Sequence, residues 1–225
     1  MPPAGRERPS PADARRPFSV RLATRDDGAA CAAIYRPYVE RTPVSFELRP
    51  PAAEEMAARI ERTLERTPWM VVEVDGIVRA YAYGSRHRER AAYDWTVETT
   101  VYVDEAFRGR GLGRAAMAAL LDILRRQGFH LVVAGVTTPN PGSIALHRAL
   151  GFERIGGFDA IGWKRGAWHG VDWFGLELGP RSEAPRPIVP LAEAVTAWER
   201  GVAQRAPAGT TASAAAARGA TRPTS

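Results

Sequence analysis

The segment over residues 101–114, VYVDEAFRGRGLGR, constrains the fold of this chain more than any other. A run rich in β-branched residues ends in a loop with glycine at three alternate positions, and an amphipathic pattern follows, which predicts a strand, a tight loop and a helix. Such glycines leave backbone N–H groups open to an anion, and the helix start adds the positive end of its dipole. The segment therefore predicts a diphosphate site, although a glycine turn before a helix can also occur without a ligand.

Three kinds of diphosphate loop differ in the residues that follow the glycines. A nucleoside triphosphatase loop requires Lys and then Ser or Thr, whereas Leu112, Gly113 and Arg114 stand here. A dinucleotide loop has the spacing G-x-G-x-x-G and an acidic residue about 20 positions on, where this chain has Leu131. The third kind, R-G-x-G-L/I-G before a long amphipathic helix, matches residues 108–113. It resembles the coenzyme A loop of the GCN5-related N-acetyltransferases (GNAT superfamily).

That resemblance implies acetyl-CoA as the co-substrate and no metal. It assigns the diphosphate to the loop and the pantetheine amides to the edge of the preceding strand. The cofactor-binding residues expected from the loop and strand are Val101, Tyr102, Val103, Arg108, Gly109, Arg110, Gly111, Leu112, Gly113 and Arg114.

Composition limits the other functions open to the chain. With 225 residues, 45% of them hydrophobic, it can form one substantial core. The formal net charge of +6 lies mostly in the tails, and no basic run interleaved with aromatic residues occurs between them, so we expect no nucleic-acid partner. We also expect no membrane partner, because no apolar run is long enough to span a bilayer. The single cysteine, Cys31, has no disulfide partner and no metal-ligand spacing, which favours a reducing cytoplasm.

The hydrophobic periods predict an α/β (α+β) chain with a mixed central sheet of about seven strands and four main helices in one domain, and the resemblance implies the GNAT fold. The strands are expected at 20–22, 69–74, 77–83, 96–103, 131–137, 153–157 and 173–178, and the helices at 24–38, 52–66, 111–127 and 140–150. Asp75-Gly76 predicts a hairpin turn, and Pro37 should kink or end the first helix.

The domain is expected over residues 18–180. A disordered leader is predicted at 1–17 and a disordered tail at 206–225, with an extended arm and a short amphipathic helix at 181–205 between domain and tail.

A second motif lies at residues 140–152, NPGSIALHRALGF. On a helix beginning near Asn140, the side chains of Asn140, Ser143 and His147 share one face. A lone helical histidine is more often structural than functional. Beside a coenzyme A loop, however, the segment resembles the N-acetyltransferase pattern in which Asn contacts the pantetheine arm and a late Tyr or His faces the thiol. The resemblance assigns that last role to His147, and Asn140 and Ser143 are expected to bind the cofactor.

A more specific resemblance lies in residues 90–103, RAAYDWTVETTVYV. This string is similar to that of the phosphinothricin N-acetyltransferases, which acetylate phosphinothricin and the related methionine sulfoximine and sulfone. The resemblance implies a small amino-acid substrate held by Arg88, Arg90 and Tyr93, a catalytic base at Glu98, and a homodimer formed through the C-terminal half.

The chemistry of acetyl transfer agrees with these assignments. An α-amine is mostly ammonium at neutral pH, so a base must remove a proton before the nitrogen attacks the thioester. Glu98 is expected to be that base. His147 is expected either to protonate the leaving thiolate or to assist Glu98 through water. Transfer is expected to be direct, in a ternary complex, without an acetyl-enzyme on Cys31.

Two alternatives remain open from the sequence. The enzyme could acetylate another small amine or a protein N-terminus. The chain could instead be a non-catalytic acetyl-CoA-binding module, for which the helix at 191–204 would bind the partner.

Overall fold

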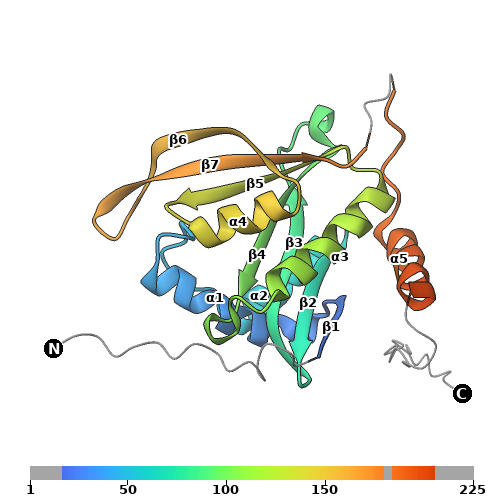
Figure 1. The fold of residues 1–225 in the computed structure, drawn as a ribbon, viewed down its shortest axis with the longest axis horizontal. Coiled ribbons are helices and arrows are strands. Elements are labelled where there is room, and N and C mark those ends of the chain that lie inside the picture. The colour runs from blue at the N-terminus through green and yellow to red at the C-terminus, as the bar shows by residue number, and fades with distance from the viewer. Residues whose placement is uncertain (1–16, 180–183, 206–225) are drawn as a thin grey trace, which may run out of the picture.

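The computed structural model describes residues 17–179 and 184–205, which form a mixed sheet with helices on both faces (Figure 1). The strands are β1 (Phe18–Leu22), β2 (Trp69–Val74), β3 (Ile77–Arg86), β4 (Thr96–Val103), β5 (Leu131–Thr138), β6 (Glu153–Lys164) and β7 (Ala167–Glu177). The α-helices in the described ranges are α1 (Gly28–Arg41), α2 (Ala53–Leu64), α3 (Leu112–Gln127), α4 (Pro141–Ala149) and α5 (Leu191–Arg205). The predicted fold class is confirmed, with α5 added to the four expected main helices.

The strand order determines where a ligand can bind. It is β1-β2-β3-β4-β5-β7-β6, in which β4 and β5 are parallel and every other pair is antiparallel. A parallel pair needs a crossover, and α3 provides it. The glycine loop therefore lies at the carboxyl end of β4, the end at which parallel strands of α/β sheets bind their ligands.

The sheet separates two apolar cores. On one face, α3 and α5 pack over alternate residues of the central strands, including Met70, Ala82 and Val97. On the other face, α1 and α2 pack over the intervening residues, including Trp69 and Tyr81. Alternation along a strand thus gives each residue of β4 a definite side of the sheet.

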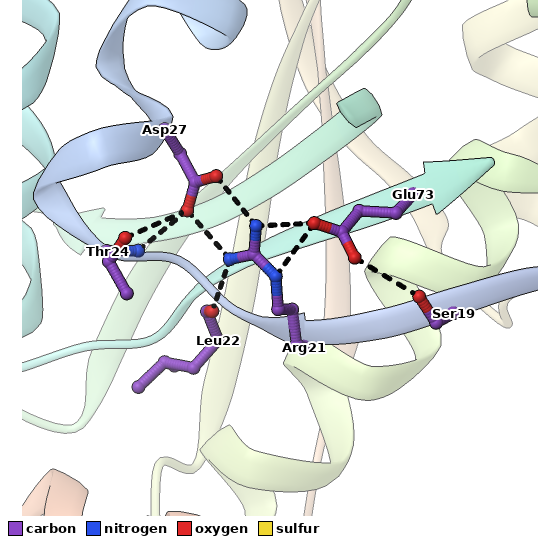
Figure 2. Close-up of polar contacts among 6 residues, drawn as sticks. All are labelled: Ser19, Arg21, Leu22, Thr24, Asp27 and Glu73. Carbon is purple, nitrogen blue, oxygen red and sulfur yellow. Dashed lines mark hydrogen bonds and ion pairs between the residues drawn. The ribbon is translucent and has the colours of Figure 1, made fainter. Parts of the chain in front are cut away.

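A capping box of Thr24 and Asp27 precedes α1. Asp27 accepts a hydrogen bond of 2.8 Å from the backbone N–H of Thr24, and a short 3₁₀ turn, η2 (Arg25–Asp27), leads into the helix. The Asp27 carboxylate also meets the guanidinium of Arg21, which bridges to Glu73 on β2 (Figure 2). This network ties the first strand to the first helix.

The prediction that Pro37 ends or kinks the first helix near Tyr38 was wrong about its end, because α1 continues to Arg41. Proline removes one helical hydrogen bond at a cost of about 3 kcal/mol. Residues on both sides of it are buried in the core, with Ile34 6%, Tyr35 6% and Val39 1% exposed. We attribute the continuation of the helix to this packing.

The last two strands are much longer than the short strands expected at 153–157 and 173–178. β6 and β7 form one antiparallel hairpin that turns at Arg165 and Gly166, both with positive φ, 54° and 77°. β6 is an edge strand with two register shifts against β7. Its glycines and its exposed face hide the apolar alternation from which a strand is recognised.

The helix predicted at 191–204 is present as α5 (Figure 1), and its apolar stripe belongs to the core that contains α3. Leu191, Ala194 and Trp198 are 9%, 2% and 8% exposed within the core that contains α3. The preceding arm is bonded as well, since Trp95 Nε1 donates to the carbonyl of Arg186 at 2.7 Å. The stripe is therefore used within the chain, which argues against a role as a partner-binding element.

Except for Pro17, the leader expected at 1–17 lies outside the described residues, and so does the tail expected at 206–225. Among the helices that are described, none has the length and apolar character needed to cross a bilayer. The same residues contain no group of three or more His, Cys, Asp or Glu side chains placed to share a metal ion.

Candidate active site

The site is built where β4 and β5 diverge. The two strands pair from Thr96 with Leu131 to Glu98 with Val133, and the pairing stops there although both strands continue. The divergence opens a cleft of about 760 Å³ between the strands, the glycine loop and α4, which we call the β4–β5 cleft. Its lining includes Thr99, Val101, Tyr102, Val103, Arg108, Gly109, Gly111, Leu112, Gly113, Arg114, Asn140, Ser143 and His147.

The glycine loop has the backbone that an anion cradle requires. Gly109 and Gly111 have φ of 78° and 83°, in the left-handed region, and a Cβ at either position would have no neighbour within 4 Å, so their backbone is open. Gly113 serves packing instead, because a Cβ there would lie 3.1 Å from the side chain of Val103. The N-terminus of α3 begins at Leu112, so its unpaired N–H groups face the same space.

The aromatic ring of Phe107 contacts two arginines at the glycine loop. The ring of Phe107 lies between two guanidinium groups, 4.4 Å from that of Arg79 and 4.5 Å from that of Arg110. Such cation–π contacts hold the arginines over the ring. Arg110 is thereby oriented, and Phe107 itself lines the cleft.

Tyr38 of α1 also supports this site, and the sequence analysis did not find it. Its hydroxyl donates to the carbonyl of Val103 at 2.6 Å and accepts from the backbone N–H of Val103 at 3.3 Å. The Nε of Arg108 lies 3.3 Å from the same hydroxyl, and the guanidinium carbon of Arg108 lies 4.8 Å from the ring centre. Tyr38 therefore links the end of β4 to the first arginine of the loop.

The three residues expected on one face of α4 are together. Asn140 caps the helix by accepting from the N–H of Ser143 at 3.2 Å. His147 lies one turn further on, and its Nδ1 is 2.8 Å from the carbonyl oxygen of Ser143. A carbonyl oxygen can only accept, so Nδ1 carries the hydrogen and Nε2 of the neutral ring has the lone pair.

The surroundings of His147 favour the neutral ring. The side chain is 3% exposed between Phe152 and Phe174, and Nε2 is buried without a hydrogen-bond partner in the described part of the chain. Burial lowers the pKa of His147 below its ordinary value, and the bond to Ser143 offsets only part of that shift. A neutral histidine is an acceptor at Nε2 and a poor proton donor there.

Glu98 lies on the opposite face of the sheet from His147. Its neighbour Val97 is buried against α3, so Glu98 points to the side of α1 and α2, whereas His147 packs on Phe174 in the core that contains α3. The carboxylate accepts from Nδ1 of His87 at 2.7 Å. His87 was also missed by the sequence analysis.

A second cavity lies on the same face of the sheet as the side chain of Glu98. It measures about 290 Å³, between α2 and the strands β3 and β4, and we call it the arginine pocket. Its lining includes Arg59, Arg62, Arg66, Arg86, Trp69, Tyr81, Tyr83, Ser85 and Tyr102. Asp94 is paired with both Arg66 and Arg86. Tyr102 of β4 lines both this pocket and the β4–β5 cleft, so one residue borders the two cavities.

Of the three residues expected to bind the substrate, the structure places only Tyr93 beside Glu98. Tyr93 lies in η3 (Ala91–Tyr93), with its ring centre 5.8 Å from that of His87 and hence beside Glu98. Arg88 and Arg90 are exposed in the loop before η3, outside the linings of both cavities. The arginines of α2 were not expected from the sequence.

Cys31 is unsuited to covalent chemistry. The thiol is fully buried in α1, and burial raises its pKa to about 12. A thiol in such a place is neither accessible nor ionised at neutral pH.

A sheet that opens at its one parallel pair, with a glycine loop and helix start at the opening, defines an enzyme that binds an acyl donor through its diphosphate. Residues 31–152 match the family model described as the Acetyltransferase (GNAT) family, and the chain belongs to that family. It is 40% identical to the phosphinothricin N-acetyltransferase of Streptomyces viridochromogenes, over 80% of this chain and 97% of the relative.

Two further relatives agree. The chain is 35% identical to the L-methionine sulfoximine/L-methionine sulfone acetyltransferase of Salmonella typhimurium, over 72% of this chain and 95% of the relative. The crystal structure of a GNAT superfamily phosphinothricin acetyltransferase from Sinorhizobium meliloti in complex with acetyl-CoA superimposes with a TM-score of 0.72. Identity with that chain is 33%, and the match covers 77% of this chain and 98% of the solved one.

Proposed function

We propose that this protein transfers the acetyl group of acetyl-CoA to the amino group of phosphinothricin or of a similar amino acid, such as methionine sulfoximine or sulfone. The observation that carries the proposal is that two cavities border the same residue of β4, Tyr102. The β4–β5 cleft suits a donor with a diphosphate, and the arginine pocket suits an acidic acceptor. The names of the similar enzymes support the same donor and acceptor.

The residues of the cleft fit acetyl-CoA, which supplies an activated acetyl thioester when bound. The open backbone at Gly109 and Gly111 and the start of α3 would hold the diphosphate. Asn140 and the edge amide of Val101 would bond the pantetheine arm. The backbone of Tyr102 faces β3 instead, like that of Asp104, whose N–H donates to the carbonyl of Arg79. The amide of Val103 is not free either, because Tyr38 already bonds both its N–H and its carbonyl.

Glu98 is proposed as the base that accepts a proton from the substrate ammonium, so that the nitrogen can attack the thioester carbonyl. Backbone N–H groups at the β4 edge would stabilise the negative charge that develops on the carbonyl oxygen. His147 is proposed to act as a neutral acceptor at Nε2 rather than as the acid. Its buried Nδ1–H is occupied by Ser143, and its lowered pKa leaves it uncharged at neutral pH.

The arginine pocket supports an acceptor that carries an anionic group besides its carboxylate. Guanidinium groups bind carboxylate and phosphinate oxygens in pairs. Arg59 is bonded to Glu47 and Glu55, and Arg66 and Arg86 share Asp94, so Arg62 is the cation that we propose for the substrate. Arg88 and Arg90 would contribute from the loop that ends at Tyr93.

A homodimer is proposed from the exposed apolar face of the β6–β7 hairpin. Trp163 and Trp168 are cross-strand partners, are 58% and 61% exposed, and pack edge to face at 5.5 Å. Clustered exposed aromatic side chains mark protein interfaces. Light scattering should give twice the chain mass of 24.5 kDa, and the double variant W163E/W168E should give the monomer mass. Ile77→Glu, at an exposed site on β3, is the control that should stay dimeric.

We propose that the protein is cytoplasmic. The single cysteine and its burial as a free thiol agree with a reducing compartment.

The decisive experiment measures thiol release from acetyl-CoA with phosphinothricin, methionine sulfoximine and a panel of plain amines. We expect turnover of the first two with kcat/KM well above that of the plain amines. Arg62→Gln should raise the KM for phosphinothricin and leave the KM for acetyl-CoA unchanged, and Arg36→Gln, on the exposed side of α1, should change neither. If neither phosphinothricin nor methionine sulfoximine is acetylated, the substrate assignment is wrong.

A further inference from the structure

The contact between His87 and Glu98 is set by the register of two strands. Ser85 on β3 is the cross-strand partner of Glu98 on β4, and His87 comes two residues later, just after β3 ends at Arg86. This brings Nδ1 of the imidazole to 2.7 Å from Oε1 of the carboxylate. The side chains are 18% and 29% exposed, so the bond is shielded from bulk water but the carboxylate is still accessible.

The chemistry of the two groups fixes the direction of the bond. An ionised carboxylate can only accept, so Nδ1 of His87 donates to Oε1. A hydrogen bond of this length to a charged acceptor is strong and directional. It occupies one oxygen of Glu98 and leaves Oε2 for another proton.

Aromatic rings hold the imidazole in this orientation. Tyr93 of η3 packs against it at 5.8 Å and 74°, and Trp173 of β7 packs against it at 6.1 Å and 77°. Trp173 in turn lies over β5, where a Cβ at Gly135 would be 3.6 Å from the indole. Gly135 lines the β4–β5 cleft, so the indole of Trp173 lies beside a residue of that cleft.

We propose that His87 is a positioning residue for Glu98, which it orients so that Oε2 faces the amine of the acceptor. This inference rests on the proposed role of Glu98 as the base. In the proton transfer, one N–H bond of the ammonium breaks, an O–H bond forms at Oε2, and the electron pair left on nitrogen attacks the thioester carbonyl. The C–S bond then breaks with its electron pair on sulfur, the second proton lost by nitrogen passes through solvent to the thiolate, and Glu98 gives its proton to solvent. His87 keeps its own proton throughout and acts only through Glu98.

Three variants separate this role from simple packing. His87→Phe keeps a ring between Tyr93 and Trp173 but removes the donor, and we expect kcat to fall by about tenfold to a hundredfold, the range for one hydrogen bond to a charged group. The KM for acetyl-CoA should stay within about twofold, since His87 does not line the cleft. His87→Asn offers an amide N–H in place of Nδ1–H and should restore most of the rate.

The third variant is the double substitution. Because His87 acts only through Glu98, H87F should cost nothing further in an E98Q background. Equal losses in both backgrounds, or full activity of H87F alone, would overturn the proposal. A wild-type protein without activity on any amine would instead refute the proposed function.

A measurement that needs no turnover tests the bond between His87 and Glu98 even in a wild-type protein without activity. Nitrogen-15 NMR of the four histidine side chains, with the His87 signals assigned by their loss in H87F, reports which ring nitrogen carries the proton. We expect the Nδ1–H tautomer in the wild type at pH 8 and a change in E98Q. A wild-type His87 with the proton on Nε2 at that pH would show that the bond to Glu98 is not made as proposed.

Discussion

The guanidinium of Arg21 and the carboxylate of Asp27 form two parallel hydrogen bonds, each of 2.8 Å (Figure 2). Arg21 lies on β1 and Asp27 at the start of α1, so the pair joins the edge strand to the helix that supports Tyr38. The geometry is the fork-to-fork arrangement in which arginine binds carboxylates most strongly.

Asp27→Asn should lower the free energy of unfolding by about 2 kcal/mol at pH 7. The value is below that for a fully buried pair, because Arg21 is 37% exposed and solvent screens its charge. Denaturant unfolding measures the change. Ser19→Ala is the control, since the Ser19 hydroxyl makes only an exposed bond of 3.4 Å to Glu73, and it should change stability by less than about 0.5 kcal/mol.

The same pair makes the stability of the protein depend on pH in acid, because its contribution is lost when Asp27 is protonated. Burial alone would raise the pKa of Asp27, but the bonds from Arg21 and from the Thr24 amide hold it below its ordinary range. The folded state then binds fewer protons than the unfolded state. The contribution is present above the unfolded pKa of about 3.9 and is lost as the pH falls through the folded pKa. The wild type and Asp27→Asn should therefore converge in stability below about pH 3.9, and parallel curves down to pH 2 would contradict this.

Lys164 at the end of β6 should stabilise the loop after α1. Its ammonium is 5% exposed and donates to the carbonyls of Val39, Ser45 and Glu47 at 2.6, 2.7 and 2.8 Å. Lys164→Met removes all three donors and should cost about 3 kcal/mol, which thermal unfolding measures. Arg165→Asn is the control at the neighbouring residue. Asparagine tolerates the positive φ of that position, 54°, so the change should cost less than about 0.5 kcal/mol. Equal losses of stability in the two variants would mean that the β6–β7 turn, and not the Lys164 ammonium, stabilises this region.

Gly111 and Gly128 make a matched pair for testing the anion cradle. They begin and end α3 with φ of 83° and 92°, and a Cβ at either site has no neighbour within 4 Å. Alanine should therefore strain each by about 1–2 kcal/mol. Only Gly111→Ala should also raise the Kd for acetyl-CoA, by about tenfold or more, because its methyl group would occupy the cradle. Calorimetric titration of both variants is the measurement, and equal affinities would place the diphosphate elsewhere.

Local patterns in the sequence predicted much of the fold and part of the candidate site. The glycine loop and the Asn140 helix are continuous segments whose spacing follows from one strand end or one helix face, and the cleft lining includes both. The Asp75-Gly76 hairpin is present with positive φ at both residues, 53° and 74°. In each case the controlling interaction lies within a few residues along the chain.

Contacts between distant segments could not be predicted in the same way. Tyr38 meets Val103 across 65 residues, and the contact depends on how α1 crosses the sheet. His87 reaches Glu98 only because β3 and β4 pair in one register, and a shift of one residue would turn the carboxylate to the other face. The arginines of α2 line a pocket only because β3 lies beside them, and the helical pattern of the sequence contains no sign of that contact.

His147 should make the protein less stable in mild acid. Its pKa is lowered by burial, so between its folded pKa and the unfolded value of about 6.5 the unfolded state binds more protons. Stability should be constant above that value and fall as the pH decreases below it. His147→Phe keeps a ring between Phe152 and Phe174 but cannot be protonated. Its stability should vary less between pH 7 and 5 in urea unfolding, and an unchanged slope would show that His147 does not carry the effect.

Glu98→Gln should separate chemistry from coenzyme binding. The amide keeps the shape of the side chain but cannot accept the ammonium proton, so kcat should fall by about a hundredfold or more at pH 7. The KM for acetyl-CoA should stay within about twofold, because Glu98 does not line the β4–β5 cleft. Glu89→Gln removes an exposed carboxylate from the loop after β3 and should leave both constants unchanged. The variant rate should also rise with pH, roughly tenfold per unit, because the substrate must then lose its proton to the solvent before it binds productively. A Glu98→Gln enzyme with full activity at pH 7 would require another base for this reaction.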